Sequence, residues 1–246
     1  MALTLSPLFL FLITMTTAIR IVQRRGNVIE FYGEEYQLRA NIFQNDISAY
    51  GIDAPEHYIF ACGFTLLSLA LSVVMVLRFL LFRSYLIASG RRSGGCCCWN
   101  ALVLGVGLLH APAILLMAWS NGKQYDNTLH FFSAVIGLEL LHVYTILNIC
   151  LELQVLRSVS ARPARIYLIL DMIQASVIVI VFPLCIYRWI TEYEAVYEWL
   201  VVVLLFGSLV PTVLHFGGMP ARNDGPSIVE ELADTGHDVS RREEED

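Results

Sequence analysis

The sequence predicts an all-α, polytopic membrane protein with six transmembrane helices in one bundle. Of its 246 residues 57% are hydrophobic and only 15% charged, and the mean hydropathy is +0.62. A soluble domain cannot cover its surface with so few polar groups. The apolar residues also gather into blocks, each long enough to cross a hydrocarbon core of about 30 Å as a helix. Polar segments rich in Gly, Ser, Arg or Asp separate these blocks.

Each apolar block predicts one helix. The predicted spans are residues 2–22, 57–82, 100–119, 129–151, 166–187 and 195–216. A membrane β-barrel would need short strands of alternating polarity, whereas Val196–Val213 is almost continuously apolar. The first block resembles a secretory leader, but it lacks a basic start, and arginines follow it where a small-residue cleavage site would lie. We therefore expect it to be a retained helix.

Basic residues near the membrane predict the orientation. Six spans place both termini, the second loop and the fourth loop on one side. That side carries Arg78, Arg83, Arg91, Arg92, Arg157, Arg162, Arg165 and Arg222, and the other carries Arg20, Arg24, Arg25, Arg39, Lys123 and Arg188. The positive-inside rule favours cytosolic termini, N-in and C-in, although the three arginines just after the first helix favour the reverse.

Two regions follow from this topology. Residues 1–216 form the predicted six-helix transmembrane domain, with a first exoplasmic loop at residues 23–56. Residues 217–246 combine Gly, Pro and many acids, and end in three glutamates and an aspartate. Such a segment has too little apolar surface to fold, so we expect a disordered acidic cytosolic tail.

Three adjacent cysteines, Cys96, Cys97 and Cys98, lie in the second loop beside the third predicted helix. Thiols at the cytosolic membrane surface are candidates for S-palmitoylation, and unmodified thiols are the alternative. Three adjacent residues cannot all reach one tetrahedral zinc ion, and no His lies nearby. We therefore predict no metal site.

The second, fourth and sixth predicted helices all begin on the exoplasmic face. Their starts carry the polar or amphipathic residues Glu56, His57, His130, Glu198 and Trp199. Together these residues are a candidate exoplasmic polar patch. Each also has a structural explanation, because the helix dipole favours carboxylates at helix N-termini and Trp is enriched at membrane interfaces.

Four ionisable residues lie at predicted membrane depth, where charge is costly. This candidate intramembrane cluster consists of His110, Glu139, His142 and Asp171. Glu139 and His142 are three residues apart and share a helix face. They fit a proton relay or a polar pocket for a lipid headgroup. Interhelical hydrogen bonding that fixes packing is the plainer interpretation.

Short motifs around these positions carry a family resemblance. They are Ile-Ser-Ala-Tyr-Gly at 47–51, Ala-Pro-Glu at 54–56, Tyr-Ile-Phe at 58–60, His130 before a small and apolar run, and Glu198-Trp199 before Leu-Leu-Phe at 204–206. In order and spacing they resemble the Frag1/DRAM/Sfk1 superfamily, which contains the damage-regulated autophagy modulators. The resemblance covers about residues 46–216.

The resemblance implies a multi-pass protein of the endomembrane system (lysosome or Golgi) or plasma membrane, without a cofactor. Members are linked to autophagy, to lipid organisation or to remodelling of GPI-anchor lipids. We expect a non-enzymatic regulator whose partners are membrane lipids and membrane proteins. A GPI-lipid remodelling factor of the Golgi or ER, with Glu139, His142 or His130 as acid or base, is the alternative. A small transporter that uses His110, Glu139 and Asp171 is the third hypothesis.

Several function classes are not predicted. The sequence contains no Walker loop, no GxGxxG and no Cys-x-x-Cys pair, and its formal net charge is -6. These features argue against nucleotide, metal and nucleic-acid binding.

Overall fold

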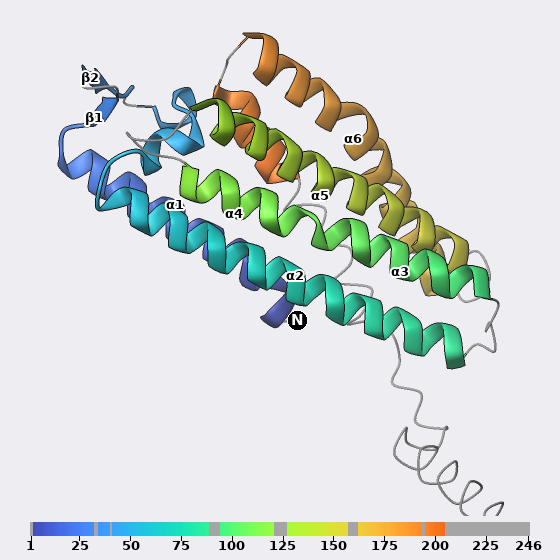
Figure 1. The fold of residues 1–246 in the computed structure, drawn as a ribbon. Helices are drawn as coiled ribbons and strands as arrows, with labels where there is room; N and C mark the ends of the chain where they lie inside the picture. Colours follow the sequence, from blue (N-terminus) through green and yellow to red (C-terminus); the bar gives the residue numbers. More distant parts are fainter. Residues whose placement is uncertain are drawn as a thin grey trace, which may run out of the picture. The chain divides into compact units, whose positions relative to one another are not determined.

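The computed structural model describes residues 2–31, 34–39, 41–88, 94–120, 127–156, 162–192 and 195–204, and most of them are helical (Figure 1). The helices are α1 (Ala2–Arg24), α2 (Glu56–Ala88), α3 (Gly94–Leu108), α4 (His110–Ser120), α5 (Asn127–Leu156) and α6 (Arg162–Glu192), followed by a short helix at Ala195–Leu204. The predicted tail, residues 217–246, lies outside the described residues.

Four helical stretches are long and apolar enough to cross a membrane. They are Ser6–Arg24, Glu56–Ser84, Cys98–Ser120 and Thr128–Leu153. These correspond to the first four predicted spans, and the helical membrane architecture is confirmed to that extent. The fifth and sixth spans and the N-in, C-in orientation stay predictions. Helix α6 covers the fifth predicted span, and Ala195–Leu204 covers the first part of the sixth.

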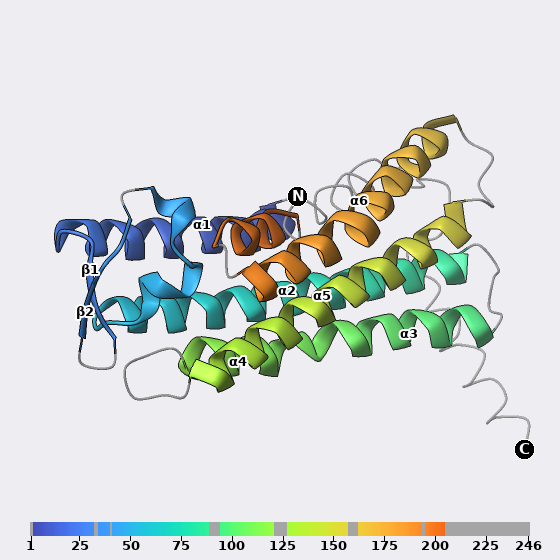
Figure 2. The same ribbon diagram turned by 90° about the horizontal axis from the view of Figure 1, so that it is seen from above.

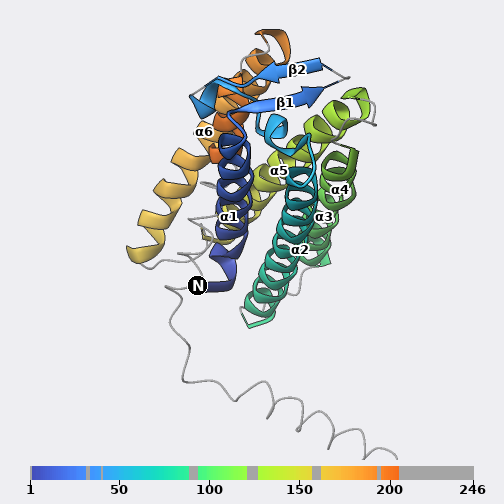
Figure 3. The same cartoon turned by 90° about the vertical axis from the view of Figure 1, so that its left-hand side faces the viewer.

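The helices pack in a simple order. Helix α1 packs against α2, α2 packs against α3 and α4, and α5 lies between these and α6 (Figures 2 and 3). One buried apolar cluster joins α1, α2, α4, α5, α6 and the short helix 195–204. A second, smaller cluster joins α2, α3 and α5 around Met75, Val103 and Tyr144. Many other apolar side chains are exposed, as expected of helices that face lipid.

The third predicted span is built from two helices, which the hydropathy pattern did not predict. Helix α3 ends at Leu108 and α4 begins at His110. Pro112 lies four residues beyond Leu108, and it has no N–H to donate to that carbonyl. The amide of Leu109 is instead shared between the carbonyls of Gly105 and Val106, at 3.3 Å each. The proline therefore explains the break.

Two glycines allow close helix contacts. A Cβ atom at Gly63 of α2 would overlap the Thr14 side chain of α1. A Cβ atom at Gly107 of α3 would lie 2.7 Å from the ring of Tyr144 and 2.9 Å from the sulfur of Met75. Glycine at each position lets neighbouring helices approach more closely than any other residue would.

The first long loop is folded rather than irregular. Just after the end of α1, Gly26 adopts a φ of +77°, and the next amide, of Asn27, donates to the carbonyl of Val22 in the last turns of the helix at 3.0 Å. The chain then forms the antiparallel strands β1 (Val28–Phe31) and β2 (Glu34–Gln37). Two short 3₁₀ helices follow, η1 (Ile42–Gln44) and η2 (Ile47–Gly51). Helix η2 packs on α1 and α2.

Candidate functional site: the first loop and the last described helix

Asn45, between η1 and η2, organises the first loop. Its side-chain amide donates to the carbonyls of Arg39 and Asn41 and to the hydroxyl of Tyr50, at 2.9, 3.2 and 3.0 Å. Its side-chain oxygen accepts the Arg39 amide at 2.9 Å. The residue is buried; its bond to Tyr50 is buried as well, and its bonds to Arg39 and Asn41 are partly buried. Sequence reasoning missed Asn45, because an asparagine in a polar loop carries no distinctive signal.

Two adjacent residues of the short helix 195–204 hold the centre of this loop. The carboxylate of Glu198 accepts the main-chain amide of Ile47 at 2.8 Å. The indole of Trp199 donates to the Asn45 carbonyl at 3.0 Å and meets the Phe43 ring edge-on at 5.6 Å between centroids. Glu198 and Trp199 are both buried. We name this set, Phe43, Asn45, Ile47, Glu198 and Trp199, the loop clamp.

The carboxyl group of Asp46 also belongs to this junction. Glu198 and the indole of Trp189 in α6 lie close enough to affect the pKa of this carboxyl group. Asp46 occupies the N-cap position of η2, yet its side chain makes no capping bond. Partial burial raises the pKa of the Asp46 carboxyl group, although the residue as a whole remains exposed, and the neighbouring Glu198 and Trp189 side chains oppose that rise.

Glu56 and His57 lie at the start of α2, and His57 contacts the other end of η2. The carboxylate of Glu56 is buried and pairs with Arg25, just after α1, at 3.3 Å. Arg25 also donates to the Ala54 carbonyl at 2.8 Å. His57 Nδ1 lies 3.2 Å from the Gly51 carbonyl, and its ring meets Trp119 edge-on. These contacts close the loop onto α1, α2 and α4.

His130 is engaged elsewhere. It is buried near the start of α5, and its Nδ1 lies 2.8 Å from the Met117 carbonyl of α4. The bond joins two neighbouring helices and not the loop. The five residues of the candidate exoplasmic patch thus fall into three groups: Glu198 with Trp199, Glu56 with His57, and His130 alone.

The candidate intramembrane cluster also divides. His142 Nδ1 lies 3.2 Å from the Glu139 carboxylate, and its ring stacks on Phe182 of α6 at 4.2 Å between centroids. His110 is fully buried, and its Nδ1 lies 2.5 Å from the Gly107 carbonyl. The structure therefore brings Glu139 and His142 together, and places His110 in separate contacts. The side chain of Asp171 lies outside the described residues.

A buried ion pair between α2 and α5 was missed by sequence reasoning. Arg78 Nε lies 3.5 Å from the Glu152 carboxylate, and both side chains are less than one-tenth exposed. Asn148 donates to the same carboxylate at 2.8 Å, and the Arg78 guanidinium lies 5.1 Å from the centre of the Phe82 ring. The available signal was a single arginine inside an apolar run, which we interpreted only as a flanking positive charge.

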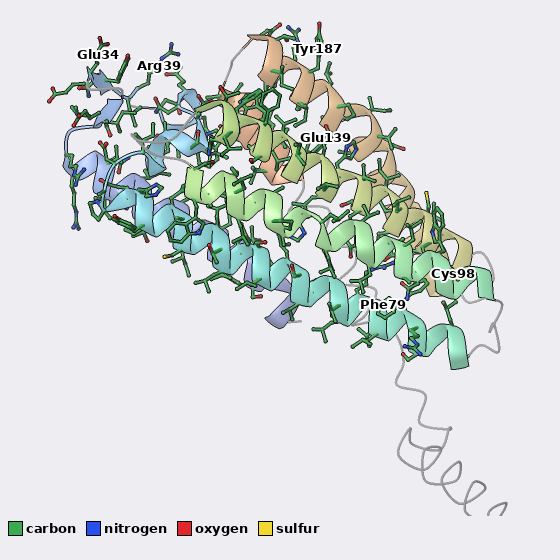
Figure 4. The ribbon with its side chains drawn as sticks, in the orientation of Figure 1. Glu34, Arg39, Phe79, Cys98, Glu139 and Tyr187 are labelled. Carbon is green, nitrogen blue, oxygen red and sulfur yellow. The ribbon has the colours of Figure 1, made fainter. Side chains whose placement is uncertain are left out.

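The cysteine triplet lies in the first turns of α3. Cys98 is a free, exposed thiol, and the side chains of Cys96 and Cys97 lie outside the described residues. Figure 4 shows Cys98 at the opposite end of the helices from Glu34 and Arg39 of the first loop. Among the described residues, no group of three His, Cys, Asp or Glu side chains is placed to hold a metal ion.

The fold and the site define a class: a multispanning helical membrane protein whose first loop folds as a cap on the helix ends. Residues 1–219 match the family model of the Frag1/DRAM/Sfk1/Cwh43P N-terminal domain. The chain therefore belongs to this family, and the resemblance carried by the short motifs is confirmed. No curated protein and no solved structure gives a match.

Proposed function

We propose that this protein is a non-enzymatic membrane regulator that acts by binding membrane lipids and membrane proteins. The observation that carries the proposal is the docked first loop. Its inner face is fixed by the loop clamp and by the Arg25–Glu56 pair, and its outer strand β2 exposes every side chain from Glu34 to Gln37. A docked cap with an acidic, exposed strand is suited to recognition.

The candidate residues support the same interpretation. Glu198 accepts a main-chain amide, Glu56 pairs with an arginine and His130 contacts a main-chain carbonyl. Protein groups thus already engage these residues, as expected of groups that fix a fold. A general acid or base needs access to substrate. We further propose, from the family, a role in autophagy at lysosomes or in the lipid organisation of the plasma membrane.

One observation favours the alternative, a GPI-lipid remodelling factor. Within the described part of the chain, His142 Nε2 is buried without a hydrogen-bond partner, while Nδ1 faces Glu139. A carboxylate behind a histidine is an arrangement that can support general base catalysis. A substitution of His142 is therefore the change that best distinguishes the two proposed functions.

Rescue of cells that lack the protein separates the two functions. Trp199→Ala removes the bond that holds Asn45, whereas His142→Phe removes the titratable ring and keeps its stacking on Phe182. If the protein is a regulator, the Trp199→Ala variant should fail to restore autophagic flux or lipid distribution in these cells, and the His142→Phe variant should restore it. Matched membrane expression of the variants is the control.

The opposite pattern would overturn the proposal. That pattern is loss of rescue by a folded and correctly localised His142→Phe variant, together with turnover of a labelled GPI lipid by the purified wild-type protein. Imaging of a tagged copy against lysosomal, Golgi and surface markers tests the compartment separately.

A further inference from the structure

A carboxylate is exposed at membrane depth on α5. Glu139 belongs to the apolar stretch Thr128–Leu153, and at 1.5 Å per residue it lies about 17 Å along the helix from one end and about 21 Å from the other. Figure 4 shows it near the middle of α5. Its side chain is nevertheless 42% exposed. An exposed acid therefore lies well inside the hydrocarbon region.

Apolar side chains surround this carboxylate on the outer face of α5. Glu139 lies three residues after Ile136 and four before Val143, so the three share one face of the helix. We name the exposed residues of this stripe the Glu139 face: Leu129, Phe132, Ile136, Glu139 and Val143. Lipid tails suit every position of the face except that of the acid.

Within the described part of the chain, one neighbour contacts the carboxylate. His142 Nδ1 lies 3.2 Å from Oε2 of Glu139, on the side of α5 where the imidazole stacks on Phe182 of α6. This contact engages one carboxylate oxygen, and the Glu139 side chain stays exposed. The histidine therefore anchors Glu139 at the helix surface without covering it.

Lipid tails cannot satisfy an exposed carboxylate. They offer neither a hydrogen-bond donor nor a positive charge, and ionisable groups at membrane depth therefore pair with other polar groups. A second membrane helix can bring such a group to the surface of α5. A basic side chain is the best match, because it supplies both hydrogen-bond donors and the opposite charge.

We propose that the Glu139 face is a docking surface for a partner membrane helix that carries a lysine or arginine near mid-depth. The apolar residues of the partner pack on Phe132, Ile136 and Val143, and its basic group pairs with Glu139. The charge selects the partner, because apolar contacts alone do not distinguish another helix from lipid. The inference rests on the proposed function, in which the protein binds membrane proteins, and gives the chemistry of one such partner.

A second copy of this chain does not supply the required charge. A symmetric dimer through the same face would bring two Glu139 carboxylates together, and like charges at short range repel. Within the four described spans, Arg78 is the basic residue farthest from a span end, and it is buried against Glu152. The partner is therefore a different membrane protein.

Binding of a defined peptide in a lipid bilayer tests the proposal. The probe is a polyleucine helix of about 20 residues with tryptophans at both ends and one central lysine. The reference peptide has leucine at the central position. Energy transfer between labelled protein and labelled peptide, in phosphatidylcholine vesicles at neutral pH, gives the two association constants. We expect the lysine peptide to bind about tenfold more tightly, which is about 1.4 kcal/mol and within the range of interhelical hydrogen bonds in membranes.

Two substitutions show whether Glu139 is responsible. Glu139→Gln keeps an acceptor for His142 and removes the charge, so it should lose most of the preference for the lysine peptide. Glu192→Gln, in the exposed pair with Arg188 on α6, should keep that preference. Equal binding of the two peptides by the wild-type protein overturns the proposal, as does a preference that Glu139→Gln leaves intact. Both outcomes leave the Trp199→Ala rescue test unaffected, so the proposed regulator role is judged separately.

Discussion

The amide of Ile47 and the carboxylate of Glu198 join positions 151 residues apart, with a hydrogen bond of 2.8 Å. The first loop therefore cannot complete its contacts until the chain has been synthesised as far as Glu198. Contacts of such large sequence separation form late, because the closure entropy of the intervening chain must be overcome first. The helices must be in place before the cap is docked.

The organisation of the loop around one amide gives the first prediction. Asn45→Asp keeps the size of the side chain but replaces an amide that faces three acceptors with a carboxylate. We expect the variant to destabilise the loop by about 3 kcal/mol, since buried acceptors lose their donor and face a negative charge. Thermal unfolding in nanodiscs measures the loss.

Asn41→Asp is the matched control for Asn45→Asp. At Asn41 the side-chain oxygen accepts the Phe43 amide at the start of η1, and an aspartate can do the same. The control should stay close to wild type. Equal losses at the two positions would refute the role assigned to Asn45.

Close packing of α1 on α2 gives the second prediction. Gly63→Ala places a methyl group against Thr14, so α1 must move or Thr14 must change rotamer. We expect a loss of about 1–3 kcal/mol from overpacking. Gly105→Ala is the control, because Gly105 also lies in a helix but has nothing within 4 Å of the added methyl.

The control should therefore be neutral or stabilising by up to about 1 kcal/mol, the difference in helix propensity between Ala and Gly. Unfolding of both variants in the same detergent provides the comparison. If Gly63→Ala gained as much stability as Gly105→Ala, α1 and α2 would not be in the contact described here.

The buried ion pair gives the third prediction. Arg78→Met alone leaves the Glu152 carboxylate buried without its cation, and Glu152→Leu alone leaves the guanidinium. Each should cost about 3–5 kcal/mol, while the double variant should recover most of the loss, because a buried pair gains little over apolar residues. A double-mutant cycle on unfolding free energies measures the coupling.

The pair formed by Arg188 and Glu192 is a useful comparison. It lies on the surface of α6, where its side chains are 45% and 35% exposed. Its coupling should be below about 1 kcal/mol. Additive effects of Arg78→Met and Glu152→Leu would contradict the direct interaction between these residues.

Hydropathy could predict the helices but not their interruptions or their pairing. The first four spans were predictable because each apolar run exceeds the membrane thickness. The break at Leu109 depends on Pro112 four residues beyond Leu108, where the composition remains apolar. The partnership of Arg78 with Glu152 depends on which helices are neighbours, and no periodicity in one chain encodes that relation.

The candidate site was predictable only in part. Glu198 and Trp199 were singled out at a helix start, but their targets in the loop were not predictable. These targets are the main-chain carbonyl of Asn45 and the main-chain amide of Ile47. Nearly every residue carries such groups, so the sequence cannot show which of them accept or donate. Similarly, the Asn45 network depends on loop backbone geometry, which composition does not specify.

Membrane topology gives the last prediction, since the six spans and their orientation are proposals. Glu34→Asn with Tyr36→Thr creates a glycosylation acceptor on β2, where both original side chains are exposed. Gly225→Thr creates an acceptor at Asn223, in the predicted tail. With cytosolic termini, the loop acceptor should receive a glycan and the tail acceptor should not. Glycosidase-sensitive mobility shifts on gels distinguish the two. A glycan on the tail with none on β2 would reverse the orientation, and glycans on both would require an odd number of spans, because acceptors separated by five crossings lie on opposite sides.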